Sequence, residues 1–453
     1  MRIVIVGDGK IGSALAEQLS REGHEITIVD RSGAPLQRTV EDLDILSIEG
    51  NGATYATQLE AGVDEAELVI AVTAQDELNL LCCLVAKKIG AKHTIARVRN
   101  PEYAGELSLI SDDLGLSLSV NPELICATEM ARTLRIPSAI KTDTFFGGKV
   151  ELLKFQLPAD SPLAGRTLME LPGITRAKVL ICAVERGEQE IHIPSGSFRL
   201  QASDRISFVA SYAGAQQFFR QMKLAAGRVR SAMLIGGGRI ALYLAWALDG
   251  MGMHITIVEQ NEEKCMAIAE KLPKATILHG DGTDHDLLES EGIFDADAFV
   301  SLTGRDEENL LMALTAKDSG VAKVLPKMSR PNYTALVHDL GIDTVISPKD
   351  VTASQISSYV RGLANSQGSA VESLHKILGG AIEAVEFTAT GATHFLNTPL
   401  KDLNFKPGLL VAAIVHGGKL LIPGGHSIIS EGDRVIVVAK SLFLKDLNDI
   451  LVR

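Results

Sequence analysis

The sequence lacks the features of a membrane-embedded or secreted protein. No apolar run approaches the roughly 18 to 20 residues that a membrane-spanning helix needs, and the first residues read as a strand rather than a signal peptide. The five cysteines show neither CxxC spacing nor a disulfide framework, which is typical of a reducing compartment. We therefore expect a cytoplasmic protein whose association with a membrane, if any, is made through another protein.

The chain also has fewer basic than acidic residues. The chain has 44 Lys and Arg against 56 Asp and Glu, a formal net charge of −12, so nucleic acid and anionic lipid are poor general partners. The apolar fraction of 46% nevertheless indicates a globular chain, and 453 residues suggest about three or four domains.

The first thirty residues carry a dinucleotide-binding fingerprint. Residues 2–6 form an apolar run typical of a buried parallel strand, a helix pattern follows the glycine-rich loop, and a second apolar run ends at Asp30. The loop itself reads Gly7-Asp8-Gly9-Lys10-Ile11-Gly12. Its three glycines suit, in turn, a tight turn, the approach of a pyrophosphate and close packing of helix on strand. The helix N-terminus offers N–H groups to phosphate, and Asp30 is positioned to accept hydrogen bonds from ribose hydroxyls. The alternative is a tight turn in an empty Rossmann unit.

The same fingerprint returns 229 residues later along the chain. The second loop reads Gly236-Gly237-Gly238-Arg239-Ile240-Ala241, and the following apolar run ends at Glu259. Ala241 replaces the third glycine, which the broader fingerprint tolerates. The turns Gly50-Asn51-Gly52 and Gly280-Asp281-Gly282 then match at a shift of 230, as do residues 73–81 and 303–311. A register held over about a hundred residues indicates a tandem duplication.

Each repeat is predicted to contain two kinds of structure. Its first part alternates strands and helices, with strands near residues 2–6, 26–30, 44–48, 68–72, 94–98 and 116–120 and a closing helix over 122–134. Its second part has short strands broken by Pro, Gly and Asp, near residues 150–156, 179–185, 191–194 and 205–210, and again near 384–387, 409–415, 420–423 and 434–438. A helix over 212–223 closes the first of these parts.

The predicted fold class is therefore α/β, a tandem duplication of a Rossmann-like, doubly wound parallel-sheet lobe followed by a small α+β lobe. We expect four domains: two Rossmann-like domains and two small C-terminal lobes, over residues 1–137, 138–227, 228–365 and 366–453.

Further candidate ligand residues follow the predicted strands, at the edge where ligands bind in this fold class. Thr73 and Ala74, with Thr303 in the second copy, come after the fourth strand; Thr73-x-x-Asp76 also resembles a helix capping box.

Asn51 and Asp281 follow the third strand of each copy and could reach an adenosine or fix an Asx turn. Arg97 and Lys327 follow the fifth strand. They could meet a phosphate or a carboxylate across a subunit boundary, or be solvated surface charges. Lys10 and Arg239 would add positive charge to the phosphate loops.

A catalytic set is missing. A dehydrogenase needs an acid–base residue beside the nicotinamide, but none of the eleven histidines occupies equivalent positions in the two copies. No HxxE or HExxH arrangement points to a metal site. Duplicated nucleotide domains without duplicated catalytic residues suggest a sensor.

The chain resembles a known family over its whole length. The resemblance rests on the paired glycine-rich loops, the acids Asp30 and Glu259, the Gly-Asn-Gly and Gly-Asp-Gly turns, and the twin Thr-x-x-Asp-Glu-x-Asn-Leu segments. Their order resembles the RCK (KTN) regulators, in particular the peripheral NAD-binding regulatory subunits of Trk potassium uptake systems. The resemblance implies binding of NAD(H), with ATP or ADP as further ligands, and gating of a Trk-type membrane subunit that translocates potassium. It also implies a ring of eight Rossmann units, hence a homotetramer, at the inner face of the cell membrane. An NAD-dependent oxidoreductase is the alternative that Asp30 and Glu259 allow.

Overall fold

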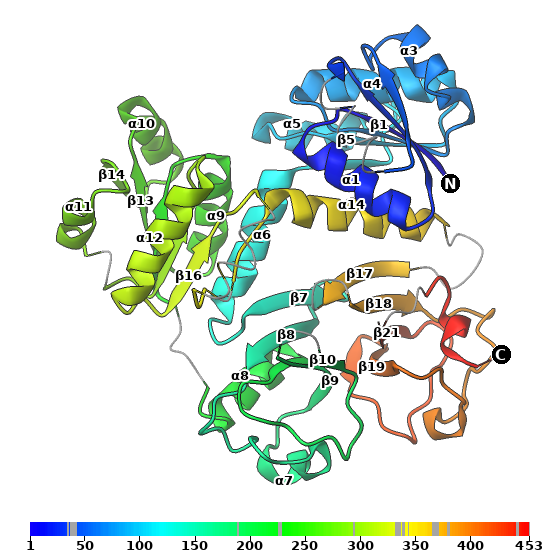
Figure 1. Ribbon diagram of the computed structural model, residues 1–453, viewed down its shortest axis with the longest axis vertical. Coiled ribbons are helices and arrows are strands. Elements are labelled where there is room, and N and C mark those ends of the chain that lie inside the picture. The colour runs from blue at the N-terminus through cyan, green and yellow to red at the C-terminus, as the bar shows by residue number, and fades with distance from the viewer. Residues whose placement is uncertain are drawn as a thin grey trace.

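Two parallel and two antiparallel β-sheets organise the chain (Figure 1). The computed structural model describes residues 1–33, 36, 43–187, 190–224, 229–292, 295–330, 337, 340–342, 344–364, 371–377, 381–440 and 444–452. The domain boundaries expected at 227/228 and 365/366 lie outside these described residues.

The first parallel sheet has the strand order β3-β2-β1-β4-β5-β6. Its strands are β1 (Arg2–Val6), β2 (Glu25–Asp30), β3 (Leu46–Glu49), β4 (Leu68–Ala71), β5 (His93–Arg97) and β6 (Leu118–Val120). The helices of this lobe are α1 (Lys10–Arg21), α3 (Tyr55–Glu60), α4 (Asp76–Ile89) and α5 (Pro101–Ile110), with a 3-10 turn η1 (Val63–Glu65). This is the predicted doubly wound topology.

The second parallel sheet repeats that order as β14-β13-β12-β15-β16. Its strands are β12 (Ser231–Ile235), β13 (His254–Glu259), β14 (Thr276–His279), β15 (Ala298–Ser301) and β16 (Lys323–Pro326). Its helices are α9 (Arg239–Gly250), α10 (Glu262–Lys271), α11 (His285–Ser290) and α12 (Asp306–Asp318). The counterpart of β6 is a single parallel bridge between Lys327 and Ile346. The tandem Rossmann-like fold is thereby confirmed.

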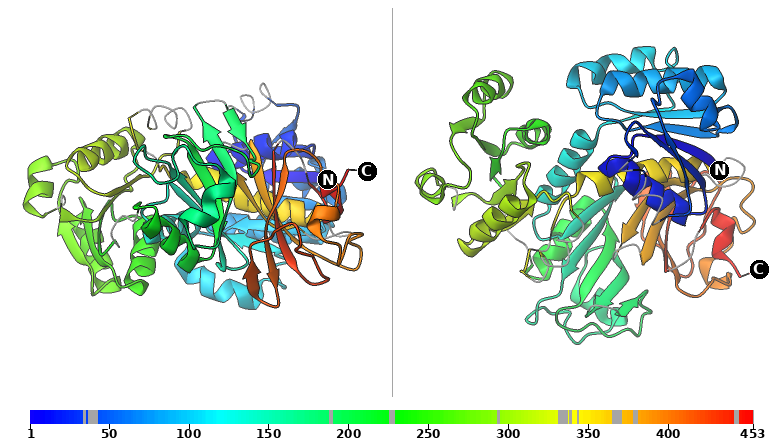
Figure 2. Two further views of the ribbon diagram at one scale, coloured as in Figure 1. Left: turned by 90° about the horizontal axis from the view of Figure 1, so that it is seen from below. Right: turned by 45° about the horizontal axis from the view of Figure 1, so that its top comes forward.

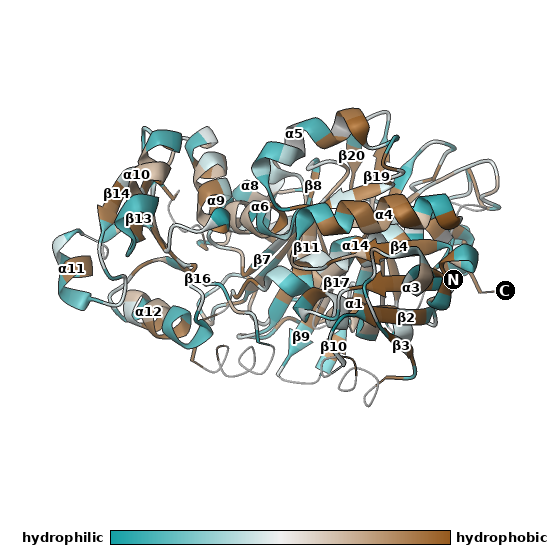
Figure 3. Cartoon of the chain, turned by 90° about the horizontal axis from the view of Figure 1, so that it is seen from above, coloured by the Kyte–Doolittle hydropathy of each residue, from teal (hydrophilic) through white to brown (hydrophobic). Residues whose placement is uncertain are grey.

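Hydrophobic periodicity explains these elements. The strands β1 and β4 are almost wholly buried, as expected for a sheet covered on both faces, and Figure 3 shows β4 in brown beneath striped helices. On α1 the buried side chains Ile11, Leu15 and Leu19 recur at helical spacing. In α4, Cys82 and Cys83 are fully buried and so contribute to packing, and burial raises the pKa of Cys82 to about 12.

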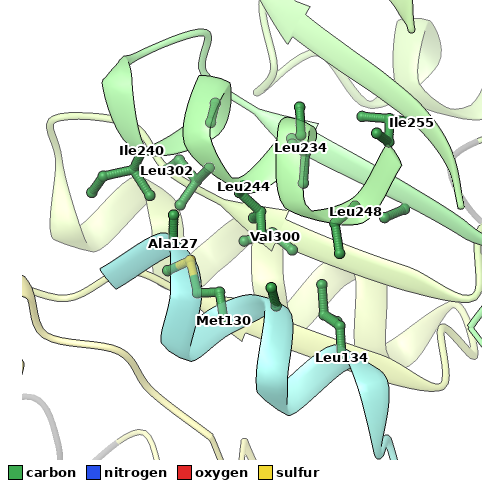
Figure 4. Close-up of a cluster of buried hydrophobic side chains, with 14 of the residues drawn as sticks. Ala127, Met130, Leu134, Leu234, Ile240, Leu244, Leu248, Ile255, Val300 and Leu302 are labelled. Carbon is green, nitrogen blue, oxygen red and sulfur yellow. The ribbon is translucent and has the colours of Figure 1, made fainter. Parts of the chain in front are cut away.

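Each Rossmann-like lobe is completed by a helix from the other copy. The helix α6 (Pro122–Arg135) follows the first sheet but packs on α9, whereas α14 (Pro348–Ala364) follows the second sheet and packs on α1. Figure 4 shows Ala127, Met130 and Leu134 of α6 facing Leu244 and Leu248 of α9. On α14, three buried apolar residues join the core around β1 and α1: Ala353, Ile356 and Val360.

The two antiparallel sheets form the small lobes, with strand orders β10-β9-β11-β8-β7 and β17-β18-β21-β19-β20. The first lobe contains β7 (Lys141–Phe145), β8 (Val150–Gln156), η2 (Leu168–Glu170), α7 (Leu171–Ile174), β9 (Val179–Arg186), β10 (Glu190–His192), β11 (Arg205–Ala210) and α8 (Tyr212–Gln221). The second contains β17 (Val371–Ile377), β18 (Ile382–Thr388), η5 (Leu400–Asp402), β19 (Leu409–His416), β20 (Lys419–Leu421), β21 (Arg434–Lys440) and η6 (Leu447–Ile450). The lobes lie side by side and share one apolar core that includes Phe145, Val209, Ala413 and Ile436 (Figure 2).

The sequence reading missed β7 and β17. Both strands carry charged residues among their apolar ones, which hides the strand pattern. In the structure Asp143 of β7 contacts Lys141 at 3.0 Å and His375 of β17 at 3.2 Å. The carboxylate of Asp143 in β7 thus has a partner, His375, that comes from the other copy and cannot be recognised from the local sequence.

Membrane-spanning helices are absent from the described part of the chain, because none of its helices combines sufficient length with sufficient apolar character.

The exchanged helix α6 provides a first prediction. Leu134 is fully buried against α9, so Leu134→Ala should destabilise the second lobe by about 2–5 kcal/mol. Trp246, the single tryptophan of the chain, lies on α9 and reports this lobe in urea unfolding followed by fluorescence. Leu124→Ala is the matched control, because Leu124 lies on the same helix but is 43% exposed. Equal losses for both variants would contradict the exchanged packing.

Candidate nucleotide-binding site

The first glycine-rich loop has the geometry that its sequence predicts. Gly7 has φ +106°, and a Cβ at this position would lie 2.9 Å from the backbone nitrogen of Thr73. A Cβ on Gly12 would lie 1.8 Å from the Gly7 carbonyl oxygen, so both positions require glycine. Gly9, in contrast, faces open space and caps α1 without a side chain, which leaves the first-turn N–H groups of α1 for an anion.

The second loop repeats this arrangement with one substitution. Gly236 has φ +100°, and Gly238 faces open space at the start of α9. Ala241 replaces the third glycine and is fully buried. At Gly237 a Cβ would lie 2.4 Å from the side chain of Ile268, so this loop is packed more closely by α10. Its first-turn N–H groups remain positioned as in the first copy.

The acids at the ends of β2 and β13 hold the loops. Asp30 accepts hydrogen bonds from the backbone N–H of Asp8 at 2.7 Å and of Ser32 at 3.0 Å. Glu259 accepts equivalent bonds from Gly237 at 2.8 Å and Asn261 at 2.9 Å. Each carboxylate oxygen has a further lone pair, so the same group can bind the loop and accept from a ribose hydroxyl.

The residues after β4 form a locked turn, not a capping box. Thr73 donates from both its backbone N–H and its hydroxyl to Asn79 Oδ1, at 2.8 and 2.7 Å. The Asn79 amide donates to the carbonyls of Thr73 and Arg97, at 3.2 and 2.9 Å. The capping box suggested for Thr73 is therefore wrong: the N-cap of α4 is Gln75, whose side chain makes no cap bond.

The second copy contains the same set of hydrogen bonds after β15. Thr303 bonds to Asn309, whose amide reaches the carbonyls of Thr303 and Lys327 at 3.2 and 2.9 Å. Asn79 and Asn309 are fully buried, and sequence reasoning did not select them. The signal was present, because both asparagines occur at the same place in the twin segments.

Asp76 and Asp306 hold the adjoining loops. Asp76 accepts from the backbone N–H of Arg99 and Asn100, each at 2.8 Å, and Asp306 accepts from Ser329 and Arg330 at 2.8 and 2.9 Å. These carboxylates connect the start of α4 or α12 to the end of the fifth strand. They therefore position the residues around Arg97 and Lys327.

Asn51 and Asp281 adopt the Asx turns that were one of two predicted roles. Asn51 accepts from the backbone N–H of Ala53 at 3.2 Å, and Asp281 accepts from Thr283 at 2.9 Å. Asp281 also accepts from the Gln260 amide at 3.0 Å. Neither residue lines the cavity described next.

A cavity of about 520 Å³ lies between the two Rossmann-like lobes. Eight of its lining residues are predicted site residues of the first copy: Gly7, Gly9, Lys10, Ile11, Asp30, Thr73, Ala74 and Arg97. Ile240 and Lys327 reach the same cavity from the second copy. Six further lining residues were not predicted: Val72 and Ser329, which come after β4 and β16, Pro122 and Glu123 at the start of α6, and Pro348 and Lys349 at the start of α14. Of these, Pro348 and Lys349 reach this cavity because α14 packs on α1 of the first copy.

The predicted residues that this cavity does not include are either loop-forming or belong to the second loop. Asp8 and Gly12 stand beside the first loop's lining residues. Besides Asp281, the predicted second-copy residues outside the lining are Gly236, Gly237, Gly238, Arg239, Glu259 and Thr303. They surround the second phosphate loop, which is built like the first.

Cations dominate the cavity. Lys10, Arg97, Lys327 and Lys349 all line it. Arg97 donates to the Thr73 carbonyl, and burial, together with the nearby Arg99, lowers the pKa of Arg97. Lys327 donates to the Leu302 carbonyl at 3.3 Å, and burial lowers the pKa of its amine. The predicted solvated role is wrong for both. The site suits a ligand with phosphate groups.

Metal-binding clusters of three or more His, Cys, Asp or Glu side chains do not occur among the residues that the structure describes.

Comparisons with known proteins agree with this architecture. The TrkA-N domain matches residues 3–120 and 232–348, and the TrkA-C domain matches residues 152–223 and 384–450. A Trk system potassium uptake protein TrkA homologue of Methanosarcina mazei is 33% identical over 99% of this chain and 100% of its own length. A TrkA homologue of Archaeoglobus fulgidus is 34% identical, again over 99% of this chain and 100% of its own.

Among solved structures, a GsuK channel bound to NAD has the same fold, with a TM-score of 0.63 and 18% identity over 97% of this chain and 77% of the channel chain. The family domains cover both repeats, and the two relatives cover nearly the whole chain. The chain therefore belongs to the TrkA family of Trk system potassium uptake proteins.

Proposed function

We propose that this protein is the nucleotide-sensing regulatory subunit of a Trk-type potassium uptake system. It binds NAD(H), and ATP or ADP, at its two phosphate loops and gates a membrane subunit that translocates potassium. The observation that carries this proposal is the cavity shared by both copies. A nucleotide on the first loop would contact Ile240 and Lys327 of the second copy, so its binding affects how the two lobes sit against each other.

The family supports this function over the oxidoreductase that the sequence left open. The relatives are named as potassium uptake proteins, not as enzymes, and a channel of the same fold is described as bound to NAD. A regulatory subunit of this kind works at the inner face of the membrane through its partner.

We propose the two glycine-rich loops, Asp30 and Glu259, Thr73 and Thr303, and the cations Arg97 and Lys327 as the nucleotide-binding residues. Asp30 and Glu259 lie beside loop N–H groups, where a ribose diol would meet them. The domain division at residues 137/138, 227/228 and 365/366 is proposed with them.

Assembly into a homotetrameric ring is the remaining part of the proposal. Leu81 on α4 is 47% exposed and Leu311 on α12 is 64% exposed, at equivalent positions of the two copies. Leu109 and Ile110 of α5 are exposed as well. Apolar side chains repeated on both lobes suit contacts with further copies of the chain in a closed assembly.

Removal of a ribose acceptor tests nucleotide binding. Asp30→Ala should weaken NADH at the first loop about 10- to 150-fold, because a hydrogen bond to a charged group contributes about 1.5–3 kcal/mol. Glu259→Ala should do the same at the second loop, and NADPH should bind more weakly than NADH to the unmodified protein. Calorimetry on both single variants and the double variant measures this, with NADH absorbance as a control for hydride transfer.

The same variants test gating. In vesicles that contain the membrane subunit, the unmodified protein should make potassium flux depend on nucleotide, and the double variant should lose that dependence. Equal NADH and NADPH affinities, or unchanged affinity in either single variant, would contradict the proposed role of the acids. A potassium flux that does not change with nucleotide in the presence of the unmodified protein would contradict the proposed gating.

Lys327 tests the contribution of the second copy to the first site. Lys327→Met should weaken nucleotide binding at the first loop about 10-fold or more, since it removes a charge from the cavity. Because burial lowers the pKa of Lys327, the amine loses its charge at lower pH than an exposed lysine. Affinity of the unmodified protein should therefore fall as the pH rises through that lowered pKa, and Lys327→Met should lack this fall. Lys88→Met, on the exposed face of α4, is the control.

The exposed leucines test assembly. Light scattering should give the mass of a tetramer for the unmodified protein and smaller species for Leu81→Asp and Leu311→Asp, since a charge in an apolar contact is costly. Leu46→Asp changes another exposed leucine, at the start of β3, and should leave the tetramer intact. A stable monomer at micromolar concentration would refute the proposed ring.

A further inference from the structure

A buried ion cluster joins three parts of the fold at Arg361. This arginine lies on α14 and its side chain is 5% exposed. It donates to both oxygens of Glu22, at 2.9 and 2.7 Å, and to both oxygens of Glu383, at 3.0 and 3.1 Å. The two carboxylates are also largely buried, at 7% and 14% exposed. A guanidinium with two bidentate partners has a narrowly defined geometry.

The first partner connects this cluster to the nucleotide site. Glu22 is the C-cap of α1, whose N-cap is Gly9 of the first phosphate loop. An α-helix is a stiff rod, so a shift of α1 at the loop moves Glu22 at its other end. α14 spans the same two places, because Pro348 and Lys349 at its start line the cavity and Arg361 lies in its last turn.

The second partner connects the cluster to the small lobes. Glu383 lies on β18, which pairs with β21 in the sheet of the second small lobe. That sheet packs on the first small lobe through their shared core. The cluster therefore joins the first phosphate loop to the small-lobe pair through named, buried contacts.

The other copy lacks this connection. Arg135 of α6 corresponds to Arg361, and it bonds Glu151 of β8 at 2.7 Å as Arg361 bonds Glu383. The C-cap of α9, however, is Met251, which has no carboxylate to offer where α1 presents Glu22. Arg135 instead stacks over the ring of Tyr212 at 4.0 Å. In the described part of the chain, the ionic route is thus specific to the first loop.

Electrostatic interactions stabilise one arrangement of Arg361, Glu22 and Glu383. Burial alone would lower the pKa of Arg361, but its hydrogen bonds to Glu22 and Glu383 outweigh burial and leave the pKa raised. Loss of one carboxylate from a buried cluster leaves charge poorly compensated, so the three groups favour one arrangement.

We propose that Arg361 transmits nucleotide occupancy of the first phosphate loop to the second small lobe through Glu22 and Glu383. Among the described residues, the second loop has no equivalent ionic route. This inference rests on the proposed function, since it requires nucleotide binding at the first loop. Its consequence is an unequal pair of sites, of which the first is the one coupled to the small lobes.

Amide hydrogen exchange of the full chain, with and without saturating NADH, tests the route. In the unmodified protein NADH should slow exchange both in residues 7–12 and in β18, the latter about 5-fold or more, the lower end of usual coupling factors. Glu22→Gln should keep the protection at residues 7–12 and lose it at β18. Glu22→Asp keeps the charge but shortens the side chain, so it should lose part of the NADH-dependent protection at β18. This variant replaces Glu22→Gln in the test if Glu22→Gln does not fold.

The matched control is Glu151→Gln, which weakens the equivalent pair in the other copy and should leave the β18 response unchanged. Absence of NADH protection at residues 7–12 in the unmodified protein would refute the proposed function itself. Protection at residues 7–12 without any response in β18 would overturn the coupling alone. A β18 response that survives in both folded Glu22 variants would also overturn it.

Discussion

The exchange of α6 and α14 is the constraint on which the rest of the structure depends. Each of α1 and α9 packs on its own sheet and is also covered by the helix of the other copy, through residues such as Met130 and Ile356. Burial of these faces is worth several kcal/mol per large side chain, so the lobes are held as a pair. The first phosphate loop therefore faces the second copy, and the cavity that contains it is lined by both lobes rather than by one.

This pairing explains the chemistry of the cavity. Helix N-termini and lysines from two directions converge on one space, where Asp30 and Glu123 supply the opposing charge. Arg97 and Lys327 are partly desolvated there, and their lowered pKa values reflect that cost. A phosphate would compensate these charges. Binding energy at such a site acts on the interface between the lobes, which is what a sensor needs.

The two copies differ at positions that join the parts of the fold to one another. Asp143 meets His375 at 3.2 Å between the small lobes, and Glu22 of the first copy stands where the second has Met251. A duplicated chain can place different residues at two equivalent positions, which a symmetric dimer of identical subunits cannot. The duplication thus permits one loop to be coupled differently from the other while both keep the same fold.

Sequence alone determined the repeated Rossmann-like topology, the loop glycines and the acids Asp30 and Glu259, because strand and helix periodicity and glycine conformation are local properties. It also placed Thr73 and Arg97 at the ligand edge, through the rule that strand ends gather there. Only the tertiary structure decided that Glu123 and Lys349 line the first cavity, that β7 and β17 are strands, and that Arg361 joins Glu22 to Glu383. These features depend on contacts between segments far apart in the sequence, such as the packing of α14 on α1 and the contact of Asp143 in β7 with His375 in β17. Local periodicity does not encode such contacts, so they are decided only when the whole chain packs.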